Sequence, residues 1–255
     1  MTVSTTRGKL IKKIIYVVIS AVFWTALWDF LSYKVGQELL LPSPAATATR
    51  LLELIKTKPF WEAAGVSLSN TLGGYIMGAA VGTVLAVITA AIRPVDILFS
   101  PINVIARATP VASFIILALV WIENVNVPSF IAFLMVTPIV WNALKTAILK
   151  VSPPLKEMAK CYRIPWHRRI FHLYVPAVIP QYVTALVTSM GLSWKAGIAA
   201  EVLCRADGSI GDMIYESKLY LETADLFAYT ATVIFLSLII EIIFTSSVRR
   251  FIKED

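Results

Sequence analysis

Two charged side chains, Arg107 and Lys195, interrupt long apolar stretches of the sequence, and Glu201 directly follows one of these stretches. A charge at bilayer depth costs at least about 2.5 kcal/mol, so such a side chain usually faces a pore or a partner of opposite charge. Two hypotheses stand for Arg107: it meets an anion or gates a pathway, or it forms a structural ion pair with Glu201. Lys195 lies near the end of its stretch, where a long side chain reaches the membrane interface.

The other reactive side chains form no familiar catalytic or metal-binding pattern. His167 and His172 lie close together without the H-E-x-x-H arrangement of a zinc site, and Cys161 and Cys204 are far apart. The sequence has no G-x-x-x-x-G-K-S/T loop, so it lacks a common means of binding ATP phosphates. We expect a protein that is not an enzyme and binds no cofactor or metal. Any energy from ATP must come from a partner.

The composition is typical of a membrane protein. Of the 255 residues, 58% are apolar and only 15% are charged, and the mean hydropathy is +0.75. Soluble domains carry about 25% charged residues. A soluble globular enzyme and a disordered chain are therefore excluded. The net charge of +7 indicates loops that face a cytoplasm and anionic lipid rather than nucleic-acid binding.

Six apolar stretches are long enough to cross a lipid bilayer, which takes about 20 residues. They cover residues 14–31, 72–92, 97–122, 127–144, 178–200 and 226–248. The sequence therefore predicts an all-α polytopic membrane protein, in which residues 1–255 form a single transmembrane domain of six helices. Between the first two spans, an amphipathic helix is expected over residues 45–56, after the turn Leu41-Pro42-Ser43-Pro44.

The distribution of Lys and Arg predicts the orientation of the chain. With the N-terminus in the cytoplasm, 15 of the 23 basic residues fall on the cytoplasmic side and six on the outer side. The positive-inside rule favours this arrangement. It makes residues 1–13, 145–175 and 249–255 cytoplasmic.

Gly74, Gly78 and Gly82 recur at four-residue intervals in the second apolar stretch. Small residues at this spacing allow two membrane helices to approach closely. We expect this face of the helix to pack against another helix.

The cytoplasmic segment from Lys145 to His172 carries seven basic residues and a single acid, Glu157. One interpretation is a solvated loop that only sets the topology. However, apolar residues recur within it at helical spacing, at Leu155, Met158, Ala159 and Tyr162. The pattern favours a short amphipathic helix that ends before Pro165 and presents one face to a partner.

These motifs resemble the permease subunits of ATP-binding-cassette (ABC) importers. Their signature is Glu-Ala-Ala, three residues, Gly and, further along, an apolar residue followed by Pro. This chain has Glu157-Met158-Ala159, Arg163 at the position of the Gly, and Val175-Pro176. Further motifs are similar to the branch that serves nitrate, alkanesulfonate, taurine, bicarbonate and pyrimidine precursors: Leu41-Pro42-Ser43-Pro44, Arg107-Ala108-Thr109-Pro110, Ser193-Trp194 and Ala200-Glu201.

The resemblance implies a type I ABC importer permease (MetI-like) fold in the inner (plasma) membrane of a prokaryote. A second copy of the chain would complete the pore as a homodimer. Two ABC ATPase subunits would carry ATP and Mg²⁺ and drive alternating access. An extracytoplasmic substrate-binding protein would deliver a small anionic or heterocyclic solute.

Two other classes were weighed from the residues alone. An ATP-independent secondary carrier or channel is the main alternative, but the sequence lacks the two related halves typical of such carriers. A membrane-embedded enzyme is the second, but the loops lack clusters of His, Asp, Glu or Ser.

The resemblance also assigns roles to residues. The helix around Glu157 would be the coupling helix, seated in a cleft of the ATPase, with the coupling residues Leu155, Glu157, Met158, Ala159, Tyr162, Arg163 and Pro165. The translocation pathway would include Arg107, Thr109, Trp194 and Glu201. Because Arg163 replaces the Gly of the signature, Pro165 would supply the break in the helix.

Overall fold

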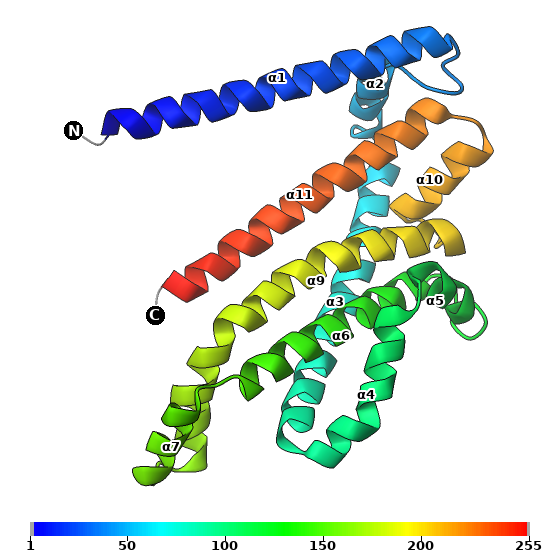
Figure 1. Ribbon diagram of the computed structural model, residues 1–255. Helices are drawn as coiled ribbons and strands as arrows, with labels where there is room; N and C mark the ends of the chain where they lie inside the picture. The colour runs from blue at the N-terminus through cyan, green and yellow to red at the C-terminus, as the bar shows by residue number, and fades with distance from the viewer. Residues whose placement is uncertain (1–2, 254–255) are drawn as a thin grey trace. The chain divides into compact units, whose positions relative to one another are not determined.

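The computed structural model describes the backbone of residues 3–253 and the side chains of residues 15–246 (Figure 1). Within this range the chain consists of helices joined by turns and short loops, without a β-strand. The predicted cytoplasmic termini, 1–13 and 249–255, include residues 1–2 and 254–255, which lie outside the described residues. The all-α prediction is confirmed for the part of the chain that the structure describes.

The helices have the following bounds. The N-terminal half contains α1 (Val3–Val35), α2 (Pro44–Leu54), α3 (Lys58–Ala91), α4 (Arg93–Ala108), α5 (Val111–Ala118) and α6 (Val127–Leu149). The C-terminal half contains α7 (Pro153–Cys161), α8 (Trp166–Arg169), the π-helical turn η1 (Ile170–Tyr174), α9 (Val175–Cys204), α10 (Ile210–Leu219) and α11 (Thr223–Lys253).

Five of the described helical segments are long and apolar enough to cross a membrane. They are Ile15–Val35, Lys58–Ala91, Val127–Leu149, Trp166–Cys204 and Thr223–Ser246. A sixth crossing is present if α4 and α5 together form one broken span. The predicted spans other than 97–122 therefore lie in or overlap continuous helical segments.

The predicted span over 97–122 needs correction, because it is not one straight helix. The chain bends by 103° between α4 and α5. Thr109, at the bend, has an extended backbone with φ −78° and ψ 132°. The residue before a proline is disfavoured in helical conformation, so Pro110 accounts for the break after α4.

The described chain divides into two compact units. The first comprises residues up to Lys58 together with Ile214–Thr232, and the second comprises Pro59–Met213 together with the residues from Val233 onward. Helix α11 contributes to both units.

In the first unit, side chains of α1 hold the loop that precedes α2. The Trp28 indole N–H donates to the carbonyl of Pro42 (3.1 Å), and the Ser32 hydroxyl donates to the carbonyl of Leu41 (2.8 Å). The hydroxyl of Ser43 then accepts the N–H of Ala46 and caps α2. The helix predicted over 45–56 is therefore present, beginning at Pro44.

An ion pair joins α2 to the start of α11 within the same unit. The Arg50 guanidinium forms a two-pronged contact with the Asp225 carboxylate, with Nη2 2.9 Å from Oδ2. It also donates to Glu53. The hydrogen bonds with Asp225 and then Glu53 raise the pKa of the Arg50 guanidinium above its ordinary value.

In the second unit, α6 and α9 run side by side and pack extensively (Figure 1). Tyr75 of α3, Val136 and Val140 of α6 and Met190 of α9 form one buried cluster. Near the end of α6, Ala147 and Val151 pack with Val178 of α9 and with Leu173 and Tyr174 of η1, as members of another cluster. This second cluster anchors the segment that contains α7 and α8.

The three glycines of α3 lie against the backbone of α6. A Cβ atom on Gly78 would lie 2.8 Å from the carbonyl oxygen of Phe133, and one on Gly82 would lie 2.7 Å from that of Thr137. A Cβ on Gly74 would lie 2.8 Å from the Cβ of Ala132. All three distances are shorter than a Cβ tolerates, so the close approach of α3 and α6 depends on these glycines.

Candidate functional site

Helix α7 separates its apolar residues into one buried side chain and several exposed ones. Ala159 is 1% exposed, whereas Met158 is 46% and Tyr162 is 77% exposed. Leu155 and Glu157 are also exposed. The helix predicted before Pro165 is therefore present, with only Ala159 of its apolar residues fully covered.

A tight turn at Arg163 ends α7. Arg163 has φ +51°, in the left-handed region, and its N–H donates to the carbonyl of Lys160 (3.0 Å). The N–H of Ile164 donates to the carbonyl of Ala159 (3.0 Å). These two bonds form a Schellman motif, in which Arg163 occupies the position usually taken by glycine. Thus Arg163 itself makes the turn, two residues before Pro165.

The chain then folds back through α8 and η1 into α9. Pro165 precedes α8, and the Arg169 Nε–H donates to the carbonyl of Ile164 (2.7 Å), which ties this arm to the turn. His172 Nδ1 lies 3.1 Å from the carbonyl of Arg168. Short π-helical turns such as η1 occur frequently at functional sites.

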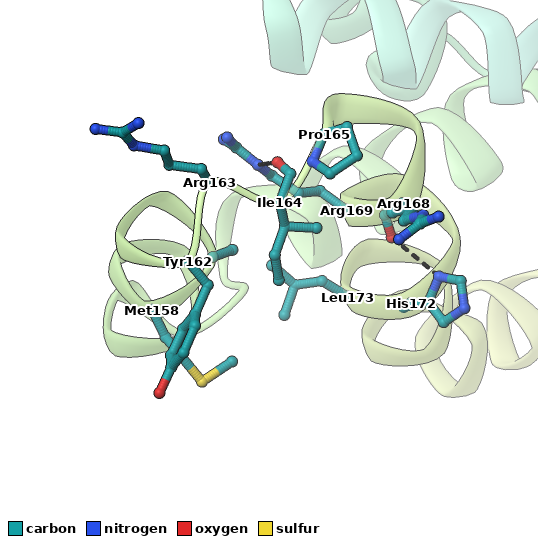
Figure 2. A pocket seen from close by; sticks show the side chains of 10 residues that line it. Met158, Tyr162, Arg163, Ile164, Pro165, Arg168, Arg169, His172 and Leu173 are labelled. Atoms are coloured by element: carbon teal, nitrogen blue, oxygen red, sulfur yellow. Dashed lines mark hydrogen bonds between the residues drawn. The ribbon is translucent and has the colours of Figure 1, made fainter.

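A cavity of about 750 Å³ lies between α7 and the α8–η1 arm (Figure 2). Its lining residues come from both arms: Met158, Ala159, Tyr162, Arg163, Ile164, Pro165, Arg168, Arg169, His172 and Leu173. The lining contains three arginines and no acid, so we expect a positive potential in the cavity. Figure 2 shows Met158 and Tyr162 on one arm and Arg168 and His172 on the other.

Three residues outside the predicted coupling set also line the cavity. Arg168, Arg169 and His172 line the cavity together with Met158, Ala159, Tyr162, Arg163 and Pro165. The sequence signal was the basic run from His167 to Arg169, which the predicted topology had used only as cytoplasmic charge. Leu155 and Glu157 of the predicted set do not line the cavity.

The four predicted pathway residues lie in different surroundings. Arg107 is exposed in the last turn of α4, and Thr109 is half-buried at the bend. Trp194 is 1% exposed, and its indole N–H donates to the carbonyl of Val233 (3.2 Å). Glu201 is 0% exposed.

The predicted alternative of an ion pair between Arg107 and Glu201 is wrong in this structure. The Glu201 carboxylate accepts the Ser67 hydroxyl (2.6 Å) and the backbone N–H of Gly211 (3.2 Å). Arg107 forms no ion pair with any side chain that the structure describes. Neutral donors on α3 and α10 thus contact Oε2 of the carboxylate that the alternative paired with Arg107. Lys195 is exposed.

Comparison with known families gives a match over most of the chain. Residues 65–253 match the family described as binding-protein-dependent transport system inner membrane component.

The matches with named relatives cover most of this chain and most of each relative. A putative aliphatic sulfonates transport permease of Bacillus subtilis is 23% identical over 206 residues, which covers 80% of this chain and 74% of that protein. A nitrate import permease of Synechococcus elongatus is 24% identical over 214 residues, covering 79% and 75%. A bicarbonate transport system permease of the same species is 23% identical, covering 75% and 72%.

Solved structures show the same fold. A chain of an amino acid ABC transporter has a TM-score of 0.65 and 15% identity, and the match covers 80% of this chain and 98% of that one. A chain of the MetNI methionine ABC transporter in inward-facing conformations has a TM-score of 0.56 and 16% identity, covering 74% and 93%.

Proposed function

The chain belongs to the family of binding-protein-dependent transport system inner membrane components, and on that premise we propose that it forms the pore of an ABC importer and receives its driving force at α7. The family and its relatives confirm the ABC importer permease predicted from the sequence, and the solved structures confirm the MetI-like fold. The chain is a multi-pass inner-membrane protein. In our proposal its termini and residues 145–175 are cytoplasmic.

The exposed apolar face of α7 carries the docking proposal. Leu155, Met158 and Tyr162 are all more than two-fifths exposed in a segment that also carries seven basic residues. In a solvated loop, such a face would leave apolar surface in contact with water. Burying it against a partner contributes about 25 cal/mol of binding free energy per Å² of apolar surface. The partner we propose is a pair of ATPase subunits, which bind the ATP and Mg²⁺.

The contacts that attach α7 to α6 and α9 are suited to transmit force from a partner to these membrane helices. Ala159 is buried, the turn at Arg163 is closed by two backbone hydrogen bonds, and Val151 and Leu173 belong to the cluster between α6 and α9. A displacement of α7 therefore moves the ends of two membrane helices with it. Rigid-body motion of this kind is a recognised route to alternating access.

We assign the solute to the class of small anions or heterocycles. The relatives are named for sulfonates, nitrate, bicarbonate and riboflavin. Arg107 is the intramembrane cation suited to an anionic solute, because it is exposed beside the bend between α4 and α5. A second copy of the chain would complete the pore, and an extracytoplasmic binding protein would select the solute.

The test of docking is a double substitution on the exposed face of α7. Met158→Asp with Tyr162→Asp should leave membrane insertion intact but abolish copurification of the ATPase and solute-stimulated ATP hydrolysis, because two charges replace the buried contacts. The matched control, Met158→Leu with Tyr162→Phe, keeps the apolar surface and should retain both. Normal copurification and coupled hydrolysis in the Asp variant would refute docking at α7 and favour an ATP-independent carrier.

A further inference from the structure

The basic side chains that line the cavity beside α7 are of two kinds: some contact backbone carbonyls of the fold, and others have no ion-pair partner among the side chains that the structure describes. Arg169 is engaged with the carbonyl of Ile164, and His172 contacts the carbonyl of Arg168, so these two side chains shape the arm. Arg163 and Arg168 are exposed and form no ion pair with any side chain that the structure describes. Figure 2 shows Arg163 at the end of α7 and Arg168 on the returning arm, and both residues line the cavity.

The backbone of Arg163 supplies a second and independent observation. A left-handed conformation costs a non-glycine residue about 1–2 kcal/mol, while glycine adopts it freely. The Schellman turn would form more easily with glycine, so the arginine is not explained by the fold. Residues held in sparsely populated backbone conformations cluster at functional sites.

From these two observations we propose that the cavity receives an acidic surface of the ATPase, with Arg163 and Arg168 binding its carboxylates. This inference rests on the proposed docking function and specifies the chemistry of the partner. A guanidinium group binds a carboxylate through two parallel hydrogen bonds, and such bonds are among the strongest in proteins. Because the cations lie on two arms, the partner surface carries at least two acidic side chains.

The apolar side chains beside the cavity favour a protein as its occupant. Met158 and Tyr162 line the cavity and also belong to the exposed apolar face of α7. Whatever fills the cavity must therefore approach along the face that docks the ATPase. Burial beside these apolar side chains would strengthen the ion pairs, because the local dielectric constant falls.

The experiment measures the affinity of the full-length permease for the ATPase that copurifies with it. The ATPase is purified separately, and binding is recorded at several salt concentrations. Arg163→Gly with Arg168→Ala should weaken binding at low salt about 10-fold or more and flatten the salt dependence, because two charge pairs are lost. Arg163→Gly relaxes the strained turn, so the loss of affinity does not follow from misfolding.

Matched controls separate the arginine contacts from general charge. Lys150→Ala removes an exposed cation of the same segment that does not line the cavity, and it should bind as the wild type does. Arg163→Lys should retain part of the affinity, since it keeps the charge without the two-pronged geometry.

The possible failures are distinguishable. If the double arginine variant binds with wild-type affinity and salt dependence while Met158→Asp with Tyr162→Asp abolishes binding, the acidic partner surface is refuted and docking stands. If Met158→Asp with Tyr162→Asp also binds normally, the docking proposal is refuted, and the acidic partner surface that rests on it is refuted too. If the arginine variant binds the ATPase normally but loses binding to vesicles containing phosphatidylglycerol, the cavity holds a lipid headgroup and the inference is overturned.

Discussion

Glu201 holds three elements of the second unit together through neutral donors. Its carboxylate accepts the hydroxyl of Ser67 on α3 and the N–H of Gly211 in the first turn of α10. The Ser67 oxygen in turn accepts the N–H of Ile210 (2.9 Å). Two orphan N–H groups at the start of α10 are thereby satisfied by buried side-chain oxygens.

Removal of this carboxylate should destabilise the protein. Glu201→Ala leaves the Ser67 hydroxyl and the Gly211 N–H without their acceptor and opens a cavity, so the free energy of unfolding should fall by about 2–4 kcal/mol. Thermal unfolding in detergent measures the change. Lys195→Ala, an exposed position on the same helix, is the control and should change stability by less than about 0.5 kcal/mol. A stable Glu201→Ala protein would contradict the structural role.

The environment of a single residue could be predicted from the sequence where a local pattern, such as helical spacing, determines whether its side chain is exposed. Helical spacing sufficed to find Leu155, Met158 and Tyr162, because a short helix exposes such a face wherever it lies. It could not identify Ser67 as the partner of Glu201, since the two are 134 positions apart and meet only through the packing of α3 on α9. The cost of a charge at bilayer depth instead suggested Arg107 as the partner.

Among the elements, the contact of α3 with α6 sets how closely two membrane helices approach. Gly78 faces the backbone of Phe133, whereas Gly73, on the same helix, has no atom within 4 Å of the place where its Cβ would lie. The two positions share a helix but differ in packing. They therefore separate the effect of close approach from that of helix propensity.

The paired substitutions Gly78→Ala and Gly73→Ala should have opposite effects. At residue 78 the new methyl group meets a backbone oxygen, which cannot rotate away, so the free energy of unfolding should fall by about 1–3 kcal/mol. At residue 73 the substitution should be neutral or stabilising by up to about 1 kcal/mol, because alanine favours the helix. Thermal unfolding of both purified variants tests this, and equal effects would show that the glycines matter only through propensity.

Prediction of elements succeeded where hydrophobic length was the only requirement. The bend between α4 and α5 was missed because the stretch 97–122 remains apolar through it, and Pro110 was read as a motif residue instead of a break. The turn after α7 was placed at Pro165, although the backbone reverses at Arg163. Sequence rules expect glycine at that position, so a left-handed arginine gives no signal.

At the scale of the whole molecule, Arg107 lies beside the bend between α4 and α5, two helices that together can form one broken membrane span. Arg107 occupies the last turn of α4 and is exposed, and it pairs with no acid that the structure describes. If Arg107 were half of a buried ion pair, removing it would leave a carboxylate unpaired and cost about 3–5 kcal/mol. Because Arg107 lacks that partner, water, the solute or a neighbouring subunit of the proposed importer must offset the cost of a charge at bilayer depth.

Arg107→Met should therefore leave the folded protein intact and remove transport. We expect an unchanged unfolding temperature and unchanged basal ATP hydrolysis in the assembled complex. Uptake of whichever of radiolabelled nitrate, taurine or bicarbonate the wild type accumulates should fall at least about 10-fold, because the lost contact forms only with the transient anion. Arg107→Lys should restore part of the uptake, and Lys195→Met controls for loss of any exposed membrane cation. A destabilised Arg107→Met protein would identify a structural partner, and normal uptake would remove Arg107 from the pathway.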